Sequence, residues 1–117
     1  KLAELNEELI RGCLGFLGIK VDVVKSSELG IVEQGTDLIV EMCKSVGATS
    51  YVSGQSGRDY LDEVRVAQAG IELIYQQFTH PTYQQVGTLF LPQMSVIDLL
   101  FNAGEKAGEY IRSAGTT

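Results

Sequence analysis

Basic side chains are scarce in this sequence: 9 lysines and arginines stand against 15 aspartates and glutamates, for a formal net charge of −6 at pH 7. Proteins that bind nucleic acid draw much of their affinity from basic side chains that neutralise phosphates. The charge balance therefore argues against a nucleic-acid binder and against electrostatic docking to an anionic membrane. It does not exclude a phosphate-bearing small molecule, because backbone amides can bind a phosphate locally.

Cysteine and histidine are also scarce, with two cysteines, Cys13 and Cys43, and one histidine, His80. A structural zinc site takes four such ligands, so this set predicts no metal site. Both cysteines fall on the apolar faces of predicted helices, where a free cysteine behaves as a small hydrophobic residue. We therefore expect two buried, reduced thiols, and nothing in the sequence requires an oxidising compartment.

Long apolar runs are missing too. No stretch is long enough to cross a bilayer, and the N-terminus has no signal-peptide pattern. A soluble, cytoplasmic protein without membrane contact is the resulting expectation. The sequence begins at Lys1 without a methionine, inside a predicted helix, which indicates the C-terminal part of a longer protein.

The sequence does contain enough apolar residues for a core: 44% of its 117 residues are hydrophobic, typical of one globular domain over residues 1–117. Apolar residues at helical spacing alternate with short β-branched runs. The order β-α-β-α-β predicts an α/β fold, a Rossmann-like open three-layer sandwich with a mostly parallel sheet and a helical C-terminus. The expected elements are helices over 2–17, 36–46 (capped by Thr36), 58–69 and 105–113, a helix after Ser95, and strands over 19–24, 49–52 and 71–75.

The stretch from Ser53 to Tyr60, SGQSGRDY, links the second predicted strand to the next helix. At this place α/β proteins often bind anionic or polar ligands, because free backbone amides and the positive end of the helix dipole point there. Amides from Gly54 to Gly57 would hold an anion, and Arg58 would add a fork of donors. Ser53 and Ser56 belong to the same predicted site. The loop is neither G-x-G-x-x-G nor a Walker motif, so a simple tight turn before a solvated helix start stays open.

A second group of polar residues follows later, with His80, Tyr83 and Asp98. In a parallel sheet the segment after the third strand leaves from the same edge as the Gly/Ser loop. We therefore expect His80 to face Ser53 or Ser56 across a shared crevice. One interpretation is a nucleophilic site with Ser53, His80 and Asp98 as catalytic residues, although no G-x-S-x-G elbow is present.

Structural roles for two of these residues stay open as alternatives. His80 precedes Pro81, and a lone histidine in such a loop is often structural. Asp98 follows Ser95 at the spacing of a helix capping box, in which Ser95 caps the helix and the Asp98 side chain reaches back.

Four sequence blocks, in this order, resemble the WbqC-like protein family, and the resemblance spans nearly the whole chain. The blocks are SGQSGRDYL (53–61), AGIE (69–72), HPTY (80–83) and SVIDLLFN (95–102). Family members usually have proline where this chain has Gln55 and Gln84. The family's N-terminal block, an opening strand followed by Gln-Pro-x-Tyr-x-Pro-Trp, is absent. The chain thus resembles the C-terminal half to two-thirds of the family architecture.

The resemblance implies a role in the biosynthesis of bacterial surface polysaccharides such as O-antigen. Family context suggests a transferase that adds an acyl or aminoacyl group to a nucleotide-linked amino sugar, with His80 as general base or acid. No cofactor is identified. The residues that would bind the nucleotide or nucleotide sugar are Ser53, Gly54, Ser56, Gly57, Arg58 and Tyr83.

Another class of function remains open beside the enzyme: a non-catalytic nucleotide-binding or assembly module. Whether the chain is active without the family's N-terminal block is also open. A missing strand would leave a sheet edge or an apolar face exposed, which favours self-association into a homo-oligomer.

Overall fold

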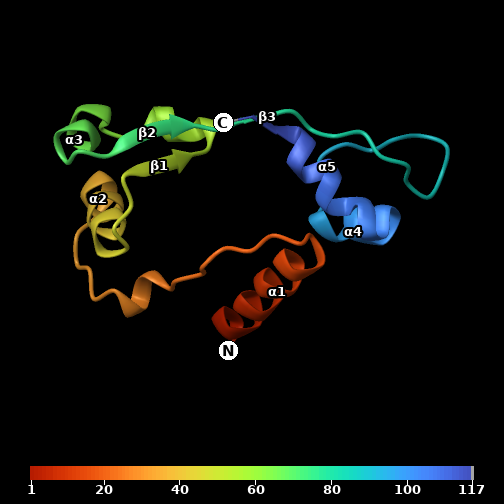
Figure 1. Cartoon of the computed structure of the whole chain (residues 1–117), viewed down its shortest axis with the longest axis horizontal. Helices are drawn as coiled ribbons and strands as arrows, with labels where there is room; N and C mark the ends of the chain where they lie inside the picture. The colour runs from red at the N-terminus through yellow and green to blue at the C-terminus, as the bar shows by residue number, and fades with distance from the viewer. Residues whose placement is uncertain (117) are drawn as a thin grey trace. The chain divides into compact units, whose positions relative to one another are not determined.

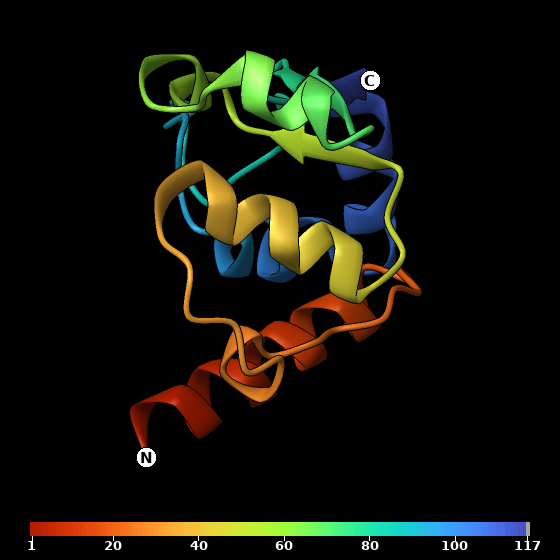
Figure 2. The same cartoon turned by 90° about the vertical axis from the view of Figure 1, so that its left-hand side faces the viewer.

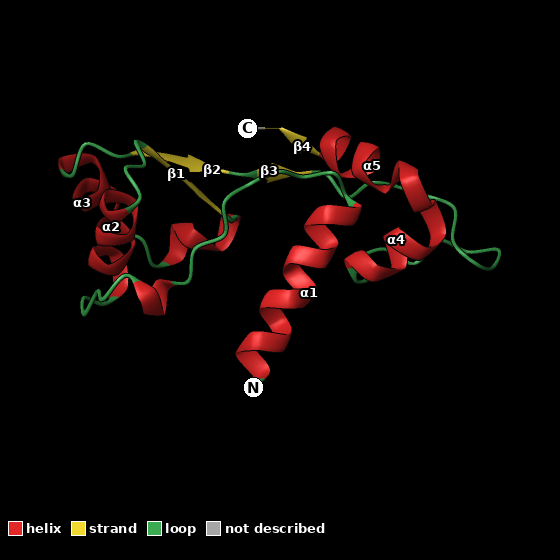
Figure 3. Cartoon of the chain, turned by 60° about the horizontal axis from the view of Figure 1, so that its bottom comes forward, coloured by secondary structure: helices red, strands yellow, loops and turns green. Residues whose placement is uncertain are grey.

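The computed structural model describes residues 1–116 and shows a mixed α/β protein with short strands and predominantly helical structure (Figures 1 and 3). The chain divides into two compact units: Lys1–Val23 together with Phe78–Thr116, and Val24–Gln77. Each unit has a hydrophobic core of its own. None of the helices within residues 1–116 is long and apolar enough to span a membrane.

The first unit is built mainly from helices around the buried residues Leu17, Tyr83, Leu99 and Ala107. Gly108 permits a close approach of the last helix to the C-terminal end of the first, because a Cβ at this position would collide with the carbonyl oxygen of Leu17. The elements are α1 (Leu2–Phe16), α4 (Val96–Ala103), the 3₁₀ helix η3 (Gly104–Lys106), α5 (Ala107–Ala114) and β4 (Gly115–Thr116), which pairs with β3 (Gln77–Phe78).

The second unit has a β-α-β arrangement with a helix before it, and its core contains Val40, Cys43, Val66 and Ile71. The helices α2 and α3 lie side by side (Figure 2). The elements are the 3₁₀ helix η1 (Ser26–Glu28), α2 (Gly35–Ser45), β1 (Ser50–Ser53), the 3₁₀ helix η2 (Gln55–Asp59), α3 (Glu63–Gln68) and β2 (Glu72–Tyr75).

The sheet confirms an α/β protein but differs from the predicted three-layer sandwich. Within residues 1–116 the strands form two separate two-stranded sheets. The predicted parallel pairing of the strands near residues 49–52 and 71–75 is confirmed: β1 and β2 are parallel, with Ser50 opposite Glu72 and Ser53 opposite Tyr75. A Rossmann-like sandwich is therefore not confirmed by the described residues.

The strand predicted over residues 19–24 is wrong, because this segment has no strand structure. Its β-branched residues favour an extended backbone, but a strand also needs a hydrogen-bonded neighbour. Here the segment is tied to α1 instead. The Ile19 N–H donates to the Leu14 carbonyl at 2.9 Å, and the Arg11 guanidinium donates to the Val23 carbonyl at 3.2 Å.

Two predicted helix starts also shift. Arg58 lies in η2, and α3 begins later, at Glu63, where the Asp62 carboxylate accepts the Arg65 N–H at 2.9 Å as an N-cap. Thr36 is not the cap of α2, which begins at Gly35. Its hydroxyl oxygen instead accepts the Asp62 N–H at 3.0 Å and so connects the starts of α2 and α3.

The two cysteines are free thiols, as predicted, but only one is fully buried. Cys43 lies in the second core with 6% of its surface exposed, whereas Cys13 on α1 is half-buried. Burial raises the pKa of the Cys43 thiol, because the apolar surroundings disfavour a thiolate.

Candidate functional site

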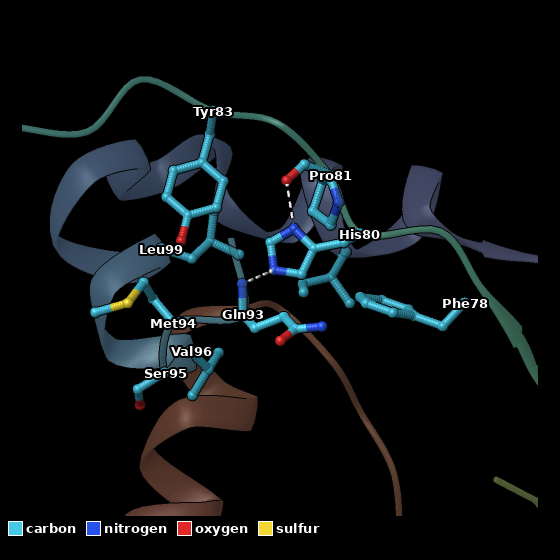
Figure 4. A pocket seen from close by; sticks show the side chains of 10 residues that line it. Phe78, His80, Pro81, Tyr83, Gln93, Met94, Ser95, Val96 and Leu99 are labelled. Carbon is cyan, nitrogen blue, oxygen red and sulfur yellow. Dashed lines mark hydrogen bonds between the residues drawn. The ribbon is translucent and has the colours of Figure 1, made fainter. Parts of the chain in front are cut away.

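A pocket of about 220 Å³ lies in the first unit, beside the segment that carries His80 (Figure 4). Its walls come from the segment 78–83, the turn 93–95, and the helices α4 and α5. No lysine, arginine, aspartate or glutamate lines it. Most of the lining is apolar, including Phe78, Met94, Val96, Leu99 and Ile111.

His80 forms one side of this pocket, and both of its ring nitrogens have hydrogen-bond partners (Figure 4). The Nδ1 atom lies 2.8 Å from the Pro81 carbonyl oxygen, and Nε2 lies 3.0 Å from the backbone N–H of Gln93. A carbonyl can only accept and an N–H can only donate, so these partners assign the neutral ring with its proton on Nδ1. The lone pair of Nε2 is therefore occupied by the Gln93 amide.

Gln93 has an unusual backbone conformation. Its φ of 61° makes it the only non-glycine residue with positive φ among the described residues. Such a conformation costs on the order of 1 kcal/mol for a side chain of this kind and persists when neighbouring contacts fix it. The hydrogen bond from Gln93 to His80 is one such contact. Gln93 also lies two residues before Ser95, the N-cap of α4, so it shapes the entrance to that helix.

Tyr83 and Asp98 form a polar network next to the pocket. The buried Tyr83 hydroxyl donates to Asp98 Oδ2 at 2.8 Å, and Gln85 Nε2 donates to the same oxygen at 2.8 Å. Asn102 Nδ2 approaches Asp98 Oδ1 at 3.1 Å. Burial, followed by the hydrogen bond to Asp98, raises the pKa of Tyr83. The network therefore keeps Tyr83 protonated and ties the loop after it to α4.

The predicted capping box is confirmed only at its serine. The Ser95 side-chain oxygen accepts the Ile97 N–H at 3.3 Å. The Asp98 carboxylate does not reach back to Ser95, because its oxygens are taken up by Tyr83, Gln85 and Asn102.

The Gly/Ser loop of the second unit has a compact internal structure. Ser53 is 3% exposed, and its hydroxyl donates to the Gly54 carbonyl at 3.1 Å. The Gly57 N–H donates to the same carbonyl at 3.0 Å. A Cβ at Gly57 would collide with Ser53 Oγ, so glycine is needed for this packing. The Asp62 carboxylate already caps the N-terminus of α3, so this helix end does not serve the anion site predicted for the loop. That predicted site therefore depends on the loop amides and Arg58.

Arg58 is exposed but held in place. Its guanidinium lies 3.9 Å from the centre of the Tyr75 ring, and its Nε donates to Gln55 Oε1 at 3.3 Å. Gln55 Nε2 in turn donates to the Gln76 carbonyl at 2.7 Å, which connects the loop to the end of β2. Where the family usually has proline, this chain thus fixes the turn through a glutamine side chain.

The predicted site residues fall into two groups, one in each unit. His80 and Tyr83 line one pocket, and Tyr83 binds Asp98. The residues from Ser53 to Arg58 lie in the second unit. The expected crevice shared by His80 and Ser53 stays a prediction. No group of three or more histidine, cysteine, aspartate or glutamate residues suited to a metal ion occurs in the described part of the chain.

Sequence reasoning missed Gln93 and the apolar pocket lining. Glutamine is an ordinary surface residue, and no pattern in the sequence indicates a left-handed backbone at this position. The preceding Pro92 signals a turn. It does not reveal that His80, 13 residues away, accepts the hydrogen bond from the turn.

Comparisons with known proteins place these two units in a family context. The sequence model of the WbqC-like protein family matches residues 1–110. The protein Rv1507c of Mycobacterium tuberculosis, described as uncharacterized, is 32% identical over 112 residues, which are 95% of this chain and 48% of that protein. The chain therefore spans about half the length of this curated relative. No solved structure matches the chain.

Proposed function

The chain belongs to the WbqC-like protein family, and on this premise we propose that it takes part in the biosynthesis of bacterial surface polysaccharides such as O-antigen. The proposed reaction is the transfer of an acyl or aminoacyl group to a nucleotide-linked amino sugar. In this reaction the amino nitrogen of the sugar attacks the acyl carbonyl, the new amide bond forms, and the donor's leaving group departs. The attacking nitrogen loses one proton, which a base must accept.

The observation that carries this proposal is the pocket beside His80. Its volume of about 220 Å³ lies below the ~300–1,000 Å³ of pockets that hold drug-sized ligands, so it suits a fragment and not a whole nucleotide sugar. Its lining has no cationic side chain for a phosphate. An uncharged, mostly apolar group such as a short acyl chain matches both its size and its chemistry.

His80 is the candidate base in this pocket, with its proton on Nδ1 and its lone pair on Nε2. The Pro81 carbonyl would hold the ring orientation while Nε2 accepts the proton from the attacking nitrogen. The Gln93 amide has to leave Nε2 before that can happen. Asp98 has a positioning role in this scheme, because Tyr83 and Gln85 already occupy its carboxylate.

The nucleotide part of the substrate would bind in the second unit. Arg58 offers an exposed guanidinium that Tyr75 and Gln55 already orient, and the adjoining Gly54 and Ser56 provide backbone at which a phosphate can approach. Ser53 would support this loop from beneath, since its hydroxyl is buried against the Gly54 carbonyl.

A pocket-filling substitution tests the acyl site. Val96 lines the pocket, and Val96→Phe would fill part of it. In this variant, binding of butyramide, measured by ligand-observed NMR, should fall at least tenfold relative to the parent chain. The matched control is Val64→Phe in the second unit, at a position that is 67% exposed, which should leave binding unchanged. Equal binding by both variants, or no binding by the parent chain, would contradict the acyl site.

The alternative is a non-catalytic nucleotide-binding or assembly module. It is favoured by the complete hydrogen bonding of the pocket: within residues 1–116 no buried side-chain nitrogen or oxygen lacks a partner. Incubation of the longer family protein with an acyl donor and a nucleotide-linked amino sugar distinguishes the two functions. A product heavier by one acyl group, detected by mass spectrometry, supports the transferase, whereas nucleotide binding without a product supports the module.

The β1–β2 pair is proposed to be part of a larger, Rossmann-like parallel sheet in the longer protein. The carbonyls of Thr49 and Ser53 accept hydrogen bonds from the β2 side, at 2.9 and 2.8 Å, so the peptide groups of Ser50 and Val52 point to the other edge. An apolar groove of about 300 Å³ adjoins this edge. Slow hydrogen exchange of the Ser50 and Val52 amides in the longer protein, but fast exchange in this chain, is the expected result, with the Tyr51 amide as the control.

A further inference from the structure

We propose that His80 and Gln93 form a proton-sensitive latch, in which neutral His80 holds Gln93 against the pocket and protonated His80 releases it. His80 thereby acts as a positioning residue for the pocket wall. In the protonated form Nε2 carries a hydrogen and cannot act as the base, so the base role needs a neutral ring from which the Gln93 amide has moved away. The latch rests on the proposed function only for the identity of the ligand. The opening of the latch can be measured without any ligand.

The two hydrogen bonds of the imidazole make the latch directional. Nδ1 donates to the Pro81 carbonyl at 2.8 Å, so the ring already carries its proton on that side. An added proton can therefore bind only at Nε2, the atom that accepts the Gln93 N–H at 3.0 Å. After protonation two N–H donors face each other, and the hydrogen bond to Gln93 is lost while the one to Pro81 remains.

The backbone of Gln93 is poised to move once this hydrogen bond breaks. Its φ of 61° is disfavoured for a residue with a side chain. Release lets the residue return to negative φ, which turns the adjoining peptide groups. Because Gln93, Met94 and Ser95 all line the pocket, the movement changes the pocket wall and not a remote surface.

Few other titratable side chains lie near His80 that could cause a pH-dependent release of Gln93. Its ring contacts Phe78 and Phe90, with ring centres 6.1 and 5.9 Å away. The titratable side chains nearby are Tyr83, which lines the same pocket, and Asp98 on α4, to which Tyr83 donates. From α5, the uncharged Ile111 lines the pocket. Histidine is also the side-chain type whose charge ordinarily changes between pH 5 and 8.

The consequence is that the pocket has two forms with different chemistry. In the closed form Gln93 masks the Nε2 lone pair. In the open, protonated form Nε2 presents an N–H donor to the pocket, which suits a carbonyl oxygen of an acyl donor. An amide probe such as butyramide should therefore bind more tightly at pH 5.5 than at pH 8.

Amide hydrogen exchange and ¹⁵N NMR of the imidazole test the latch in the whole chain. The protection factor of the Gln93 amide should fall at least tenfold from pH 8 to pH 5, while the ring changes from the Nδ1–H form to the doubly protonated form. The Leu91 amide, two residues before Gln93 in the sequence, is the internal control. It donates to Gln85 Oε1 at 2.7 Å, and this amide oxygen does not titrate.

Two variants sharpen the test. His80→Gln keeps an acceptor oxygen but cannot titrate, so protection at residue 93 should become independent of pH. Gln93→Gly relieves the left-handed backbone, so the latch should stay closed to a lower pH than in the parent chain.

The titration of the parent chain decides the matter even if a variant fails to fold. A Gln93 amide equally protected at pH 5 and pH 8 would overturn the latch, and so would an imidazole protonated on Nε2 alone at pH 8. Equal loss of protection at Leu91 and Gln93 would also overturn it, because the change would then be general unfolding and not a local release.

Discussion

The polar side chains next to the two candidate binding regions, one in each unit, are held in different ways. In the first unit, Tyr83 and Asp98 form a hydrogen-bonded network beside an uncharged pocket, with Tyr83 only 6% exposed. In the second, Arg65 pairs with Asp37 at 2.6 Å and Arg58 stacks on Tyr75, with the arginines at the surface. Water-exposed cations can meet an anionic ligand, whereas an uncharged pocket suits an apolar group. The contrast supports assigning the acyl group to the first unit and the nucleotide to the second.

The largest effect on stability is expected from Gly108→Ala in the first unit. The new Cβ would collide with the carbonyl oxygen of Leu17, a backbone atom that cannot rotate away. Forcing α5 off α1 should lower the free energy of unfolding by about 3 kcal/mol, measured by urea denaturation. Gly12→Ala is the matched control, because nothing lies within 4 Å of its added Cβ on α1. That variant should be more stable than the parent by up to about 1 kcal/mol.

A glycine-to-alanine substitution in the second unit should lower the stability less, because the added Cβ there meets a side chain and not the backbone. In Gly57→Ala the added Cβ meets Ser53 Oγ and comes within 3.1 Å of Leu61 Cδ1. We expect a loss of about 2 kcal/mol. The double variant with Ser53→Ala should recover part of this loss, because it removes the colliding oxygen. A double variant no more stable than Gly57→Ala alone would show that the loop backbone, and not Ser53, sets the cost.

Removing one hydroxyl in the first unit tests the network. Tyr83→Phe deletes the hydrogen bond to Asp98 and should lower stability by about 1–2 kcal/mol at pH 7. Because the folded state raises the pKa of Tyr83, the tyrosine's contribution is complete below its unfolded pKa of about 10 and is lost as pH rises through the higher folded value.

The pH dependence of unfolding checks this sign. Between about pH 10 and 11.5 the parent chain should lose stability faster than the Tyr83→Phe variant. Tyr75→Phe in the second unit is the comparison, since burial and Glu63 raise the pKa of Tyr75 in the same direction. Identical alkaline slopes for the parent chain and the Tyr83→Phe variant would contradict a raised pKa at Tyr83.

Features that follow a regular sequence pattern could be predicted from the sequence, whereas contacts made by individual side chains in loops could not. The parallel β1–β2 pairing follows from the strand-helix-strand pattern and the Ser95 cap from the capping pattern, and both predictions are confirmed. The strand over 19–24 was not, because α1 holds this segment through Arg11. The roles of Asp98 and Gln93 depend on partners 13 to 15 residues away, at Gln85, His80 and Tyr83. Periodicity and capping rules are silent about such contacts.

The smallest effect on stability is expected from Arg58→Ala. This variant is also the sharpest test of the comparison between the units. The side chain is at the surface, so the free energy of unfolding should change by no more than about 0.5 kcal/mol. If Arg58 binds a phosphate, the affinity for a nucleoside diphosphate should nevertheless fall about tenfold or more, the cost of one hydrogen bond to a charged group. Isothermal titration calorimetry at two salt concentrations measures this loss.

The matched control is Arg65→Ala, which removes the same charge from the same unit. Arg65 is engaged by Asp37 and lies outside the Gly/Ser loop. Its loss should leave nucleotide affinity within about twofold, since the Arg65 guanidinium is already paired with the Asp37 carboxylate and is not among the groups proposed to bind the phosphate. Equal losses in both variants would mean that net charge and not the loop attracts the nucleotide. The second unit would then have no phosphate site to set against the uncharged pocket of the first.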